Sequence, residues 1–436
     1  MKTLICLVAT LSLGACGADA PPADGGPSDV PVSDGGATES DGGSFDGGSF
    51  DGGASDGGSF DAGSVDAGAG RPDASTPPPP VDTVDWLVPA RVWSGSPETI
   101  EVTLRDGSGA PVDTSGTTVT LDIASGTSTA VLGAATDLGS GRLSFSFRGL
   151  EEGSAVRLDV RVGGALLDAL SPEIEIIVPL LHYTPAGATR TISEIRSNLS
   201  GHAWNPDSGQ FMLIRNNDRQ LHVLDADLSH LAALTLRSNP IGSDLEDIVY
   251  LGGSAGAPEY ALVDENGRAA IGTIPAGSTT ALDMSTWQSV RYASNPAVGN
   301  KGGEGIAHDP ATGRMWVCTE RSPMIIYGFM RPAPGADVSF ETGFAVTQPF
   351  DADASLRSEI TDISSCLFDP RTQRLLVLSH ESSRLVDVDW DGTVIATYDV
   401  DGAPQFEGVT LIADRDMLLS SEANRIRSYT YGGPVP

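Results

Sequence analysis

The stretch GGEGIAHDPATGRMWVCTER, residues 302–321, decides how the C-terminal part of the chain is interpreted. It predicts one β-hairpin. Glu304 opens the first strand, DPATG at 309–313 makes the turn, and Glu320 closes the second strand. Because the open ends of an antiparallel hairpin lie side by side, the two acids are expected at the same end of the sheet.

Related hairpins recur through the C-terminal half of the chain. The residues that open the first strands are Ser200, Glu246, Glu304, Asp362 and Glu407, and the spacings of 46, 58, 58 and 45 residues each fit one four-stranded sheet. The second strands end in a further acid, and these acids are Asp218, Glu265, Glu320, Glu381 and Glu422.

This repeat predicts an all-β fold with a five-bladed β-propeller over residues 183–436. The last repeat lacks a fourth strand, and TRTISEI at 189–195 is expected to supply it. Such closure ties the two ends of the ring together and removes an open sheet edge.

A different pattern precedes the propeller. Residues 81–180 hold short strands with period-two alternation, separated by Gly and Asp turns, which predicts an antiparallel β-sandwich. The segments TLRDGSGAPV, DLGSGRLSFSF and SAVRLDVRVGG resemble those of bacterial immunoglobulin-like domains. No catalytic constellation stands out, so we expect a spacer or docking module.

Residues 1–15 have the features of a secretory leader, with Lys2 before an apolar run too short to span a bilayer. The run ends in LGAC at 13–16, which resembles the bacterial lipobox. The resemblance implies cleavage before Cys16 and a lipid on that cysteine, which would anchor the protein to the membrane of the cell envelope, at the outer membrane. The alternative is an ordinary cleaved signal peptide with an incidental cysteine.

Residues 16–80 form a low-complexity linker after Cys16, in which Asp recurs every five residues from Asp41 to Asp66 among Gly, Ser and Pro. This composition predicts a disordered tether, and a calcium-binding repeat is the alternative. The whole chain has 58 Asp and Glu against 26 Lys and Arg, a net charge of −32. Such a surface repels nucleic acids and attracts cations, so no nucleic-acid partner is expected.

Several motifs resemble the SdiA-regulated (YjiK-like) propeller family. They are KGGEGIAHD with TERSP, DISSCLFDPRTQRLLVLSHESSRLVDVDWDG, and FEGV with SSEAN, and SGHAWNPDSG and DLEDIVY fit the earlier blades. The sequence departs from the family at His202, where Leu is usual, at Asp247, where Gly often stands, and at Ala423, where Pro often stands. The resemblance implies a fold more readily than a function.

The propeller places the first-strand acids in one ring. Glu246, Glu304, Asp362 and Glu407 are expected around one mouth of the central channel, with Asp218, Glu265, Glu320, Glu381 and Glu422 in a wider ring. So many carboxylates need protons, a cation or nearby bases, for which Arg215, Arg219, Arg321, Lys301 and Arg384 are the candidates. Oxygen ligands favour calcium over zinc or copper. Alternatively, the acids are structural and accept backbone hydrogen bonds.

His202 and His380 are expected near the acidic mouth and His308 toward the opposite face. Either of the first two could be a general base or an ordinary hydrogen-bonded side chain. No G-x-S-x-G, H-E-x-x-H or P-loop motif is present. The sequence therefore favours a surface-anchored, cation-dependent module that binds a small molecule or an envelope partner. The alternative is a calcium-dependent hydrolase of phosphoesters or lactones.

Cys318 and Cys366 remain after the leader and the anchor cysteine. They fall on adjacent predicted blades, and export would allow a disulfide between them to persist. The alternative is a pair of small buried thiols.

Overall fold

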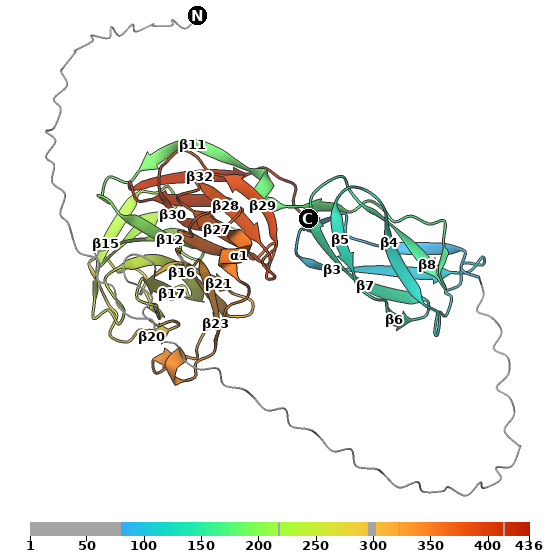
Figure 1. The fold of residues 1–436 in the computed structure, drawn as a ribbon, viewed down its shortest axis with the longest axis horizontal. Coiled ribbons are helices and arrows are strands. Elements are labelled where there is room, and N and C mark those ends of the chain that lie inside the picture. The colour runs from blue at the N-terminus through green and yellow to red at the C-terminus, as the bar shows by residue number, and fades with distance from the viewer. Residues whose placement is uncertain (1–79, 217–218, 295–301, 322, 413–414) are drawn as a thin grey trace, which may run out of the picture. The chain divides into compact units, whose positions relative to one another are not determined.

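A computed structural model describes residues 80–216, 219–294, 302–321, 323–412 and 415–436. The predicted leader, Cys16, the linker up to residue 79, Asp218 and Lys301 lie outside these ranges. The described chain is all-β, as predicted (Figure 1). Its helical elements are short, namely η1 (Pro179–His182), η2 (Phe340–Thr342) and α1 (Ala352–Leu356). None of the helices in these ranges is long and apolar enough to cross a membrane.

Residues 83–177 form two antiparallel sheets that share one apolar core, and a short parallel pair. One sheet has the order β1-β3-β7-β5, with β6 on β7, and the other has the order β4-β8-β9. Inward residues such as Val102, Phe145 and Leu158 are fully buried, as the alternating sequence predicts. The parallel pair is β10 with β2. The bounds are β1 (Thr83–Leu87), β2 (Arg91–Trp93), β3 (Pro97–Arg105), β4 (Val119–Ser125), β5 (Thr129–Leu132), β6 (Thr136–Gly139), β7 (Arg142–Glu151), β8 (Arg157–Val162), β9 (Ala165–Leu166) and β10 (Glu175–Ile177).

Residues 183–431 form four- and five-stranded sheets, most of them built from strands in chain order. The first comprises β12 (Leu199–Asn205), β13 (Gln210–Arg215), β14 (Gln220–Asp225) and β15 (His230–Arg237), and the second β16 (Leu245–Ser254), β17 (Ala257–Asp264), β18 (Arg268–Thr273) and β20 (Gln288–Arg291). The third comprises β21 (Gly303–Asp309), β22 (Arg314–Thr319), β23 (Ile325–Met330) and β25 (Val346–Thr347), and the fourth β26 (Ser365–Asp369), β27 (Arg374–Ser379), β28 (Arg384–Val388) and β29 (Val394–Asp399). The last contains β30 (Phe406–Ile412), β31 (Asp416–Ser421) and β32 (Arg425–Tyr431), and it begins with a strand from elsewhere.

The first strands of these sheets form a closed ring. β12 contacts β16, β16 contacts β21, β21 contacts β26, β26 contacts β30, and β30 returns to β12. The sheets radiate from this ring, which is the arrangement of a β-propeller (Figure 1).

The last sheet is completed by a strand that precedes the ring in sequence. β11 (Tyr183–Thr191) pairs antiparallel with β32, from Tyr183 opposite Tyr431 to Thr191 opposite Arg425. The sequence predicted this closure with residues 189–195, so the range was wrong. The pairing starts at Tyr183, whose buried ring packs edge-to-face on Tyr431.

Two short strands hold neighbouring sheets together in a way that the sequence did not predict. β19 (Ala281–Asp283) lies between β18 and β20 in the chain but pairs in parallel with β15 of the preceding sheet. β24 (Val338–Ser339) likewise follows β23 but pairs with β20. The disulfide Cys318–Cys366 adds a covalent link between β22 and β26, which leaves no thiols at these positions.

The first strands approach one another closely on the axis of the ring. A side chain on Gly305 would place its Cβ 2.4 Å from the backbone nitrogen of Cys366, and one on Gly201 would lie 2.0 Å from Asp247 Oδ1. At Gly408 the nearest atom would be Ser420 Oγ at 2.4 Å. We call this narrow level of the channel the waist, and it requires glycine at these positions.

We expect Gly305→Ala to destabilise the protein by about 1–3 kcal/mol, because the added methyl group overlaps backbone that cannot move independently. Gly256→Ala is the matched control, since a Cβ there meets no atom within 4 Å. Urea unfolding of both variants checks the expectation. Equal stability of the two variants would show that the waist is not as tight as described.

Candidate functional site

The acids that open the first strands stand at β-bulges. In β16 the register passes from Leu245 opposite Asp264 to Asp247 opposite Val263, which leaves Glu246 as the extra residue. Glu304 in β21 and Glu407 in β30 occupy the same place in their strands. A bulge turns one side chain out of the regular alternation, so each acid is aimed at the channel mouth rather than into a sheet face.

Asp362 reaches the mouth differently, because it precedes β26 and lies outside any strand. Its carboxylate is fully buried and accepts hydrogen bonds from Ser379 Oγ and from the backbone amides of His380 and Glu381. The structural alternative expected such acids to accept from backbone amides of the neighbouring blade, whereas the donors to Asp362 lie at the end of β27 in its own sheet. Asp362 therefore fixes the turn after β27.

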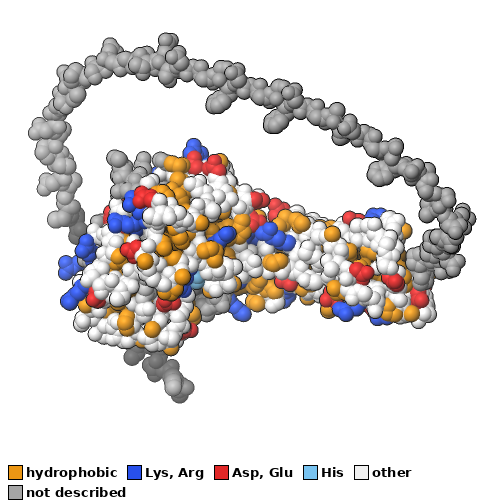
Figure 2. Space-filling model, turned by 90° about the horizontal axis from the view of Figure 1, so that it is seen from below, with side chains coloured by type: hydrophobic (Ala, Val, Ile, Leu, Met, Phe, Trp, Pro, Cys, Tyr) orange, Lys and Arg blue, Asp and Glu red, His pale blue; other side chains and the backbone are white. Residues whose placement is uncertain are grey.

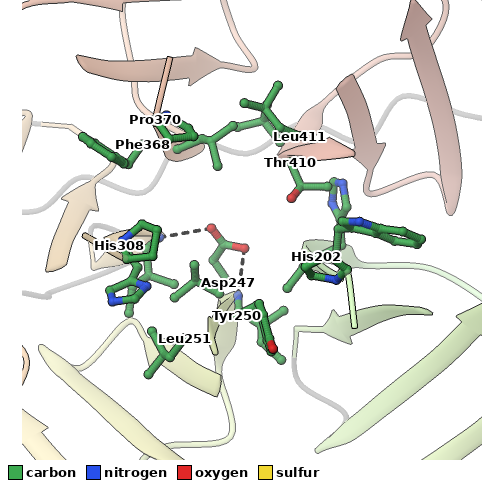
Figure 3. Close-up of a pocket in the computed structure, with 18 of the residues that line it drawn as sticks. His202, Asp247, Tyr250, Leu251, His308, Phe368, Pro370, Thr410 and Leu411 are labelled. Atoms are coloured by element: carbon green, nitrogen blue, oxygen red, sulfur yellow. Dashed lines mark hydrogen bonds between the residues drawn. The ribbon is translucent and has the colours of Figure 1, made fainter. Parts of the chain in front are cut away.

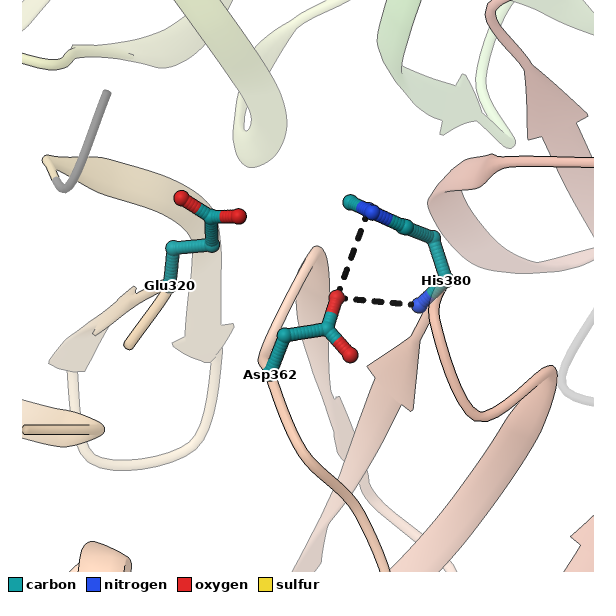
Figure 4. Close-up of side chains that lie close together, drawn as sticks. All are labelled: Glu320, Asp362 and His380. Atoms are coloured by element: carbon teal, nitrogen blue, oxygen red, sulfur yellow. Dashed lines mark hydrogen bonds and ion pairs between the residues drawn. The ribbon is translucent and has the colours of Figure 1, made fainter. Parts of the chain in front are cut away.

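One side of the mouth is a mixed cluster of Glu320, Asp362 and His380 (Figure 4). Glu407 lies beside this cluster. His380 Nδ1 lies 3.1 Å from Glu407 Oε1 and 3.3 Å from Asp362 Oδ2. Chiefly the contact with the Glu407 carboxylate raises the pKa of His380 to about 9, so the imidazole contributes a positive charge to this cluster. Burial nevertheless raises the pKa of Glu407 to about 7, because it outweighs the attraction of His380.

The other side of the mouth contains carboxylates alone. Asp244, Glu246 and Glu265 each offer an oxygen, and these oxygens lie within 4.8 Å of one another. Asn216 Nδ2 donates to Glu246 Oε1 at 2.7 Å. We call Asp244, Glu246 and Glu265 the acidic cluster.

The acidic cluster raises the pKa of its own members. Burial, and then the charge of Glu265, raise the pKa of Glu246 well above its usual value, and burial followed by Asp244 raises that of Glu265 to about 7. Burial and the charge of Glu246 likewise raise the pKa of Glu304, which interacts with both sides of the mouth. Within the described ranges no Lys, Arg or His forms an ion pair with Glu246, Glu265 or Glu304.

The remaining acids of the predicted outer ring differ in exposure. Glu320 is buried, and its Oε2 has no hydrogen-bond partner among the described residues. Glu381 is exposed and pairs with Arg321, which also lies 3.1 Å from Glu320 Oε1. Glu422 is partly exposed, and its backbone amide donates to Gln405. Asp218 lies outside the described residues.

Of the basic residues expected to neutralise the acids of the mouth, the structure places only some at the mouth. Arg321 is at the mouth, whereas Arg384 pairs with Asp399 and Glu359. Arg215 Nε donates to the carbonyl of Ser197. Arg219 adopts a left-handed backbone conformation and its carbonyl accepts from Leu236. Lys301 lies outside the described ranges.

His202 is not at the acidic mouth, which corrects the expectation for it. Its ring is fully buried, with Nδ1 at 2.9 Å from Ser420 Oγ and Nε2 at 3.2 Å from the carbonyl of Leu418. Burial lowers its pKa to about 4. The bulge between Leu199 and His202 shifts the strand alternation, which turns His202 away from the mouth. His380 lies at the mouth and His308 toward the opposite face, as expected.

Sequence reasoning missed two members of the mouth and the role of a third residue. Asp244 and Asn216 lie just before and after strands, where polar residues are common and give no signal. Asp247 follows Glu246 directly. The sequence shows that it replaces a glycine that is frequent in the family, but it does not predict a role for the aspartate side chain. Its side chain fills the waist, as described below.

A family model described as SdiA-regulated matches residues 179–430. The chain belongs to the SdiA-regulated family. The match covers the ring, its closing strand β11 and every acid of the mouth, which confirms the resemblance seen in the sequence. It says nothing about the leader or the sheets of residues 83–177.

Solved structures similar to this SdiA-regulated protein share little sequence with it. A luciferin-regenerating enzyme is 13% identical with a TM-score of 0.37, covering 57% of this chain and 96% of its own. The calcium-binding protein regucalcin from Agrobacterium tumefaciens is 14% identical with a TM-score of 0.34, covering 57% and 96%. A putative gluconolactonase is 9% identical with a TM-score of 0.35, covering 58% and 95%.

The raised pKa values predict how the stability of the metal-free protein depends on pH. Glu265 and Glu407 bind protons more tightly when folded, so the stability they supply is present below about pH 4.5 and is lost as the pH rises through about 7. The contribution of His380 is present below about pH 6.5 and is lost as the pH rises through about 9. Both changes have the same sign. The buried His202 and His308, whose pKa values are lowered to about 4, act in the opposite sense, but only below about pH 6.5.

We therefore expect the melting temperature in EDTA to fall by about 5 °C or more between pH 6.5 and pH 9. Differential scanning calorimetry at intermediate pH values measures this. The Glu265→Gln variant should show a shallower fall, because glutamine does not titrate. A melting temperature that rises over this interval would contradict the described mouth.

Proposed function

We propose that this SdiA-regulated protein is a cation-dependent ligand-binding module, with a divalent cation held by the acidic cluster. The observation that carries the proposal is the close approach of Asp244, Glu246 and Glu265, whose carboxylate oxygens lie within 4.8 Å of one another. Among the described residues, no Lys, Arg or His side chain forms an ion pair with these three acids. The mixed cluster, by contrast, already contains His380, and Arg321 pairs with its Glu320. A cation on the acidic cluster would remove the charge repulsion that now favours protonation.

The donor set indicates which ion fits. Carboxylate oxygens from Asp244, Glu246 and Glu265, with Glu304 and the amide oxygen of Asn216 nearby, are hard ligands that suit calcium better than zinc or copper. The ligand atoms come from bulges and strand ends rather than from one rigid loop. Such a set suits the flexible coordination of calcium better than the strict octahedron of magnesium.

Two of the four expected metal ligands have other partners. Asp362 accepts three protein hydrogen bonds and Glu407 pairs with His380. We therefore assign the ion to Glu246 and the acidic cluster, with Glu304 next to it. Asp362 and Glu407 instead hold His380 in place. A ligand that coordinates the ion from the solvent side would contact His380 and Glu320.

The rest of the chain fits a module displayed at the cell envelope. We infer that the sheets of residues 183–431 are the five blades predicted from the repeat. We also infer that residues 81–180 form an immunoglobulin-like spacer and that a lipid on Cys16 anchors the linker. Palmitate labelling of the wild type and a Cys16→Ser variant tests the anchor.

The protonation of His380 at the mouth argues against the alternative function, a hydrolase that uses this histidine as a general base. The raised pKa keeps His380 protonated at neutral pH, so it cannot accept a proton from water there. On the face shown in Figure 2, acidic, basic and hydrophobic side chains are interspersed. Calcium-dependent turnover of phosphoesters or lactones that Glu304→Gln abolishes would favour the hydrolase.

We expect calcium to raise the melting temperature by several degrees at pH 8 and little at pH 5, where the cluster is protonated. Glu246→Gln should weaken calcium binding at least tenfold by isothermal titration calorimetry while raising the melting temperature in EDTA. Glu341→Gln is the matched control, because Glu341 is exposed and pairs with Arg291. Equal calcium affinity of the three proteins, or none in the wild type, would refute the proposal.

A further inference from the structure

The channel contains a second cavity on the other side of the waist from the acids. Its volume is about 320 Å³, and every first strand contributes to its wall (Figure 3). Along β16, Glu246 faces the mouth, Asp247 fills the waist, and the residues from Ile248 to Gly252 line the cavity. The two ends of one channel therefore have opposite chemical character.

The floor of this cavity is the side chain of Asp247 (Figure 3). Its Oδ1 accepts from the amide of Ile248 at 2.8 Å, and its Oδ2 accepts from the amide of Ile306 at 3.1 Å and from Ser365 Oγ at 3.2 Å. Asp247 thereby joins β16, β21 and β26 across the axis and is itself 3% exposed. None of the acids of the mouth lines this cavity, which indicates that Asp247 separates the two.

The rim of the cavity is formed by prolines at equivalent places in three hairpin turns, NPDSG, DPATG and DPRTQ. They are Pro206, Pro310 and Pro370. The residue before each proline caps its own turn. Asn205 Oδ1 accepts from the amide of Asp207, Asp309 Oδ1 from that of Ala311, and Asp369 Oδ1 from that of Arg371. Fixed φ angles and capped turns make the rim rigid before any ligand arrives.

The wall is apolar and carries no compensating charge. Val249, Leu367, Val409 and Leu411 are among its side chains, and the described residues that line it include no Lys or Arg. An anion would find no partner there. A cation would find only Asp247, whose oxygens are already engaged. The cavity therefore suits a neutral molecule, which would displace water that cannot form its usual hydrogen bonds.

The polar side chains in the wall that are available to such a molecule include His308 and Thr410, and His308 is the one that can only accept. His308 lies at the cavity, and its ring faces the backbone carbonyl of Tyr250. Burial lowers its pKa to about 4, so the ring is neutral and keeps one nitrogen as a hydrogen-bond acceptor. Among the described residues no donor pairs with that nitrogen. A ligand hydroxyl or N–H group would supply one.

We propose that this cavity is a binding site for a neutral, largely apolar small molecule that donates one hydrogen bond to His308. The volume accommodates on the order of ten to twenty non-hydrogen atoms. The site is independent of the cation proposed at the mouth, because Asp247 separates the two. The protein thus has two ligand sites on one axis.

The test uses 2-naphthol as a neutral aromatic probe that carries one hydroxyl donor. We expect saturable binding with one site per chain by calorimetry, unchanged by EDTA. 2-Methoxynaphthalene, which lacks the donor, should bind at least fivefold more weakly, and the anion 2-naphthoate should not bind. Failure of 2-naphthol to bind saturably would overturn the proposal, whereas loss of calcium binding would not affect it.

Two variants locate the probe. Val249→Trp should fill the cavity and abolish binding, while Met330→Trp, at a half-exposed position on β23, should bind like the wild type. His308→Phe should bind both neutral naphthalenes equally, because the acceptor is lost and the apolar wall remains. Wild-type affinity in Val249→Trp, or a preference for 2-naphthol that survives in His308→Phe, would refute the assigned site.

Discussion

The close approach of the first strands at the waist is the constraint on which the rest of the propeller depends. Glycine at 201, 305 and 408 lets the strands meet, and the side chain of Asp247 occupies the space that remains. Because the strands converge there, they diverge on both sides, and each side becomes a concave site. One contains acids placed by bulges, and the other contains the apolar second halves of the same strands.

The charges of the mouth are balanced unevenly. His380 and Arg321 compensate one side with fixed positive charge, whereas Asp244, Glu246 and Glu265 depend on protons or on an added ion. Burial is the first cause of the raised pKa at Glu246, Glu265 and Glu304, and mutual repulsion is the second. The free energy of folding, the bound protons and any bound cation are therefore linked at one place.

The sequence predicted much of the fold because the repeat is explicit. From the hairpins with an acid at each open end, the sequence predicted the ring of sheets and the positions of Glu304 and Glu320. It also predicted that a strand before the first repeat closes the ring. His202 was misplaced because a bulge shifts the alternation by one residue, and no local signal marks a bulge. The sequence did not predict that β19 and β24 pair with preceding sheets, because this pairing depends on tertiary contacts. It also did not single out Asp244, because acids are common in loops.

The apolar cavity could not be predicted from the sequence for a different reason. Val249, Leu367 and Val409 have the same strand pattern as fully buried core residues, so periodicity does not distinguish a wall from a core. The disulfide Cys318–Cys366 was one of two alternatives, because strand position predicts that two cysteines are close but not that they are bonded.

The pairing of β11 with β32 also sets an order of events during folding. β11 is synthesised first and β32 last, with more than 200 residues between them, so the final sheet can form only after the whole domain has been synthesised. This is a contact of very high sequence separation, which slows folding and leaves a sheet edge unpaired in the meantime. A chain that stops before Arg425 would keep that edge permanently open and would be prone to pair with other chains.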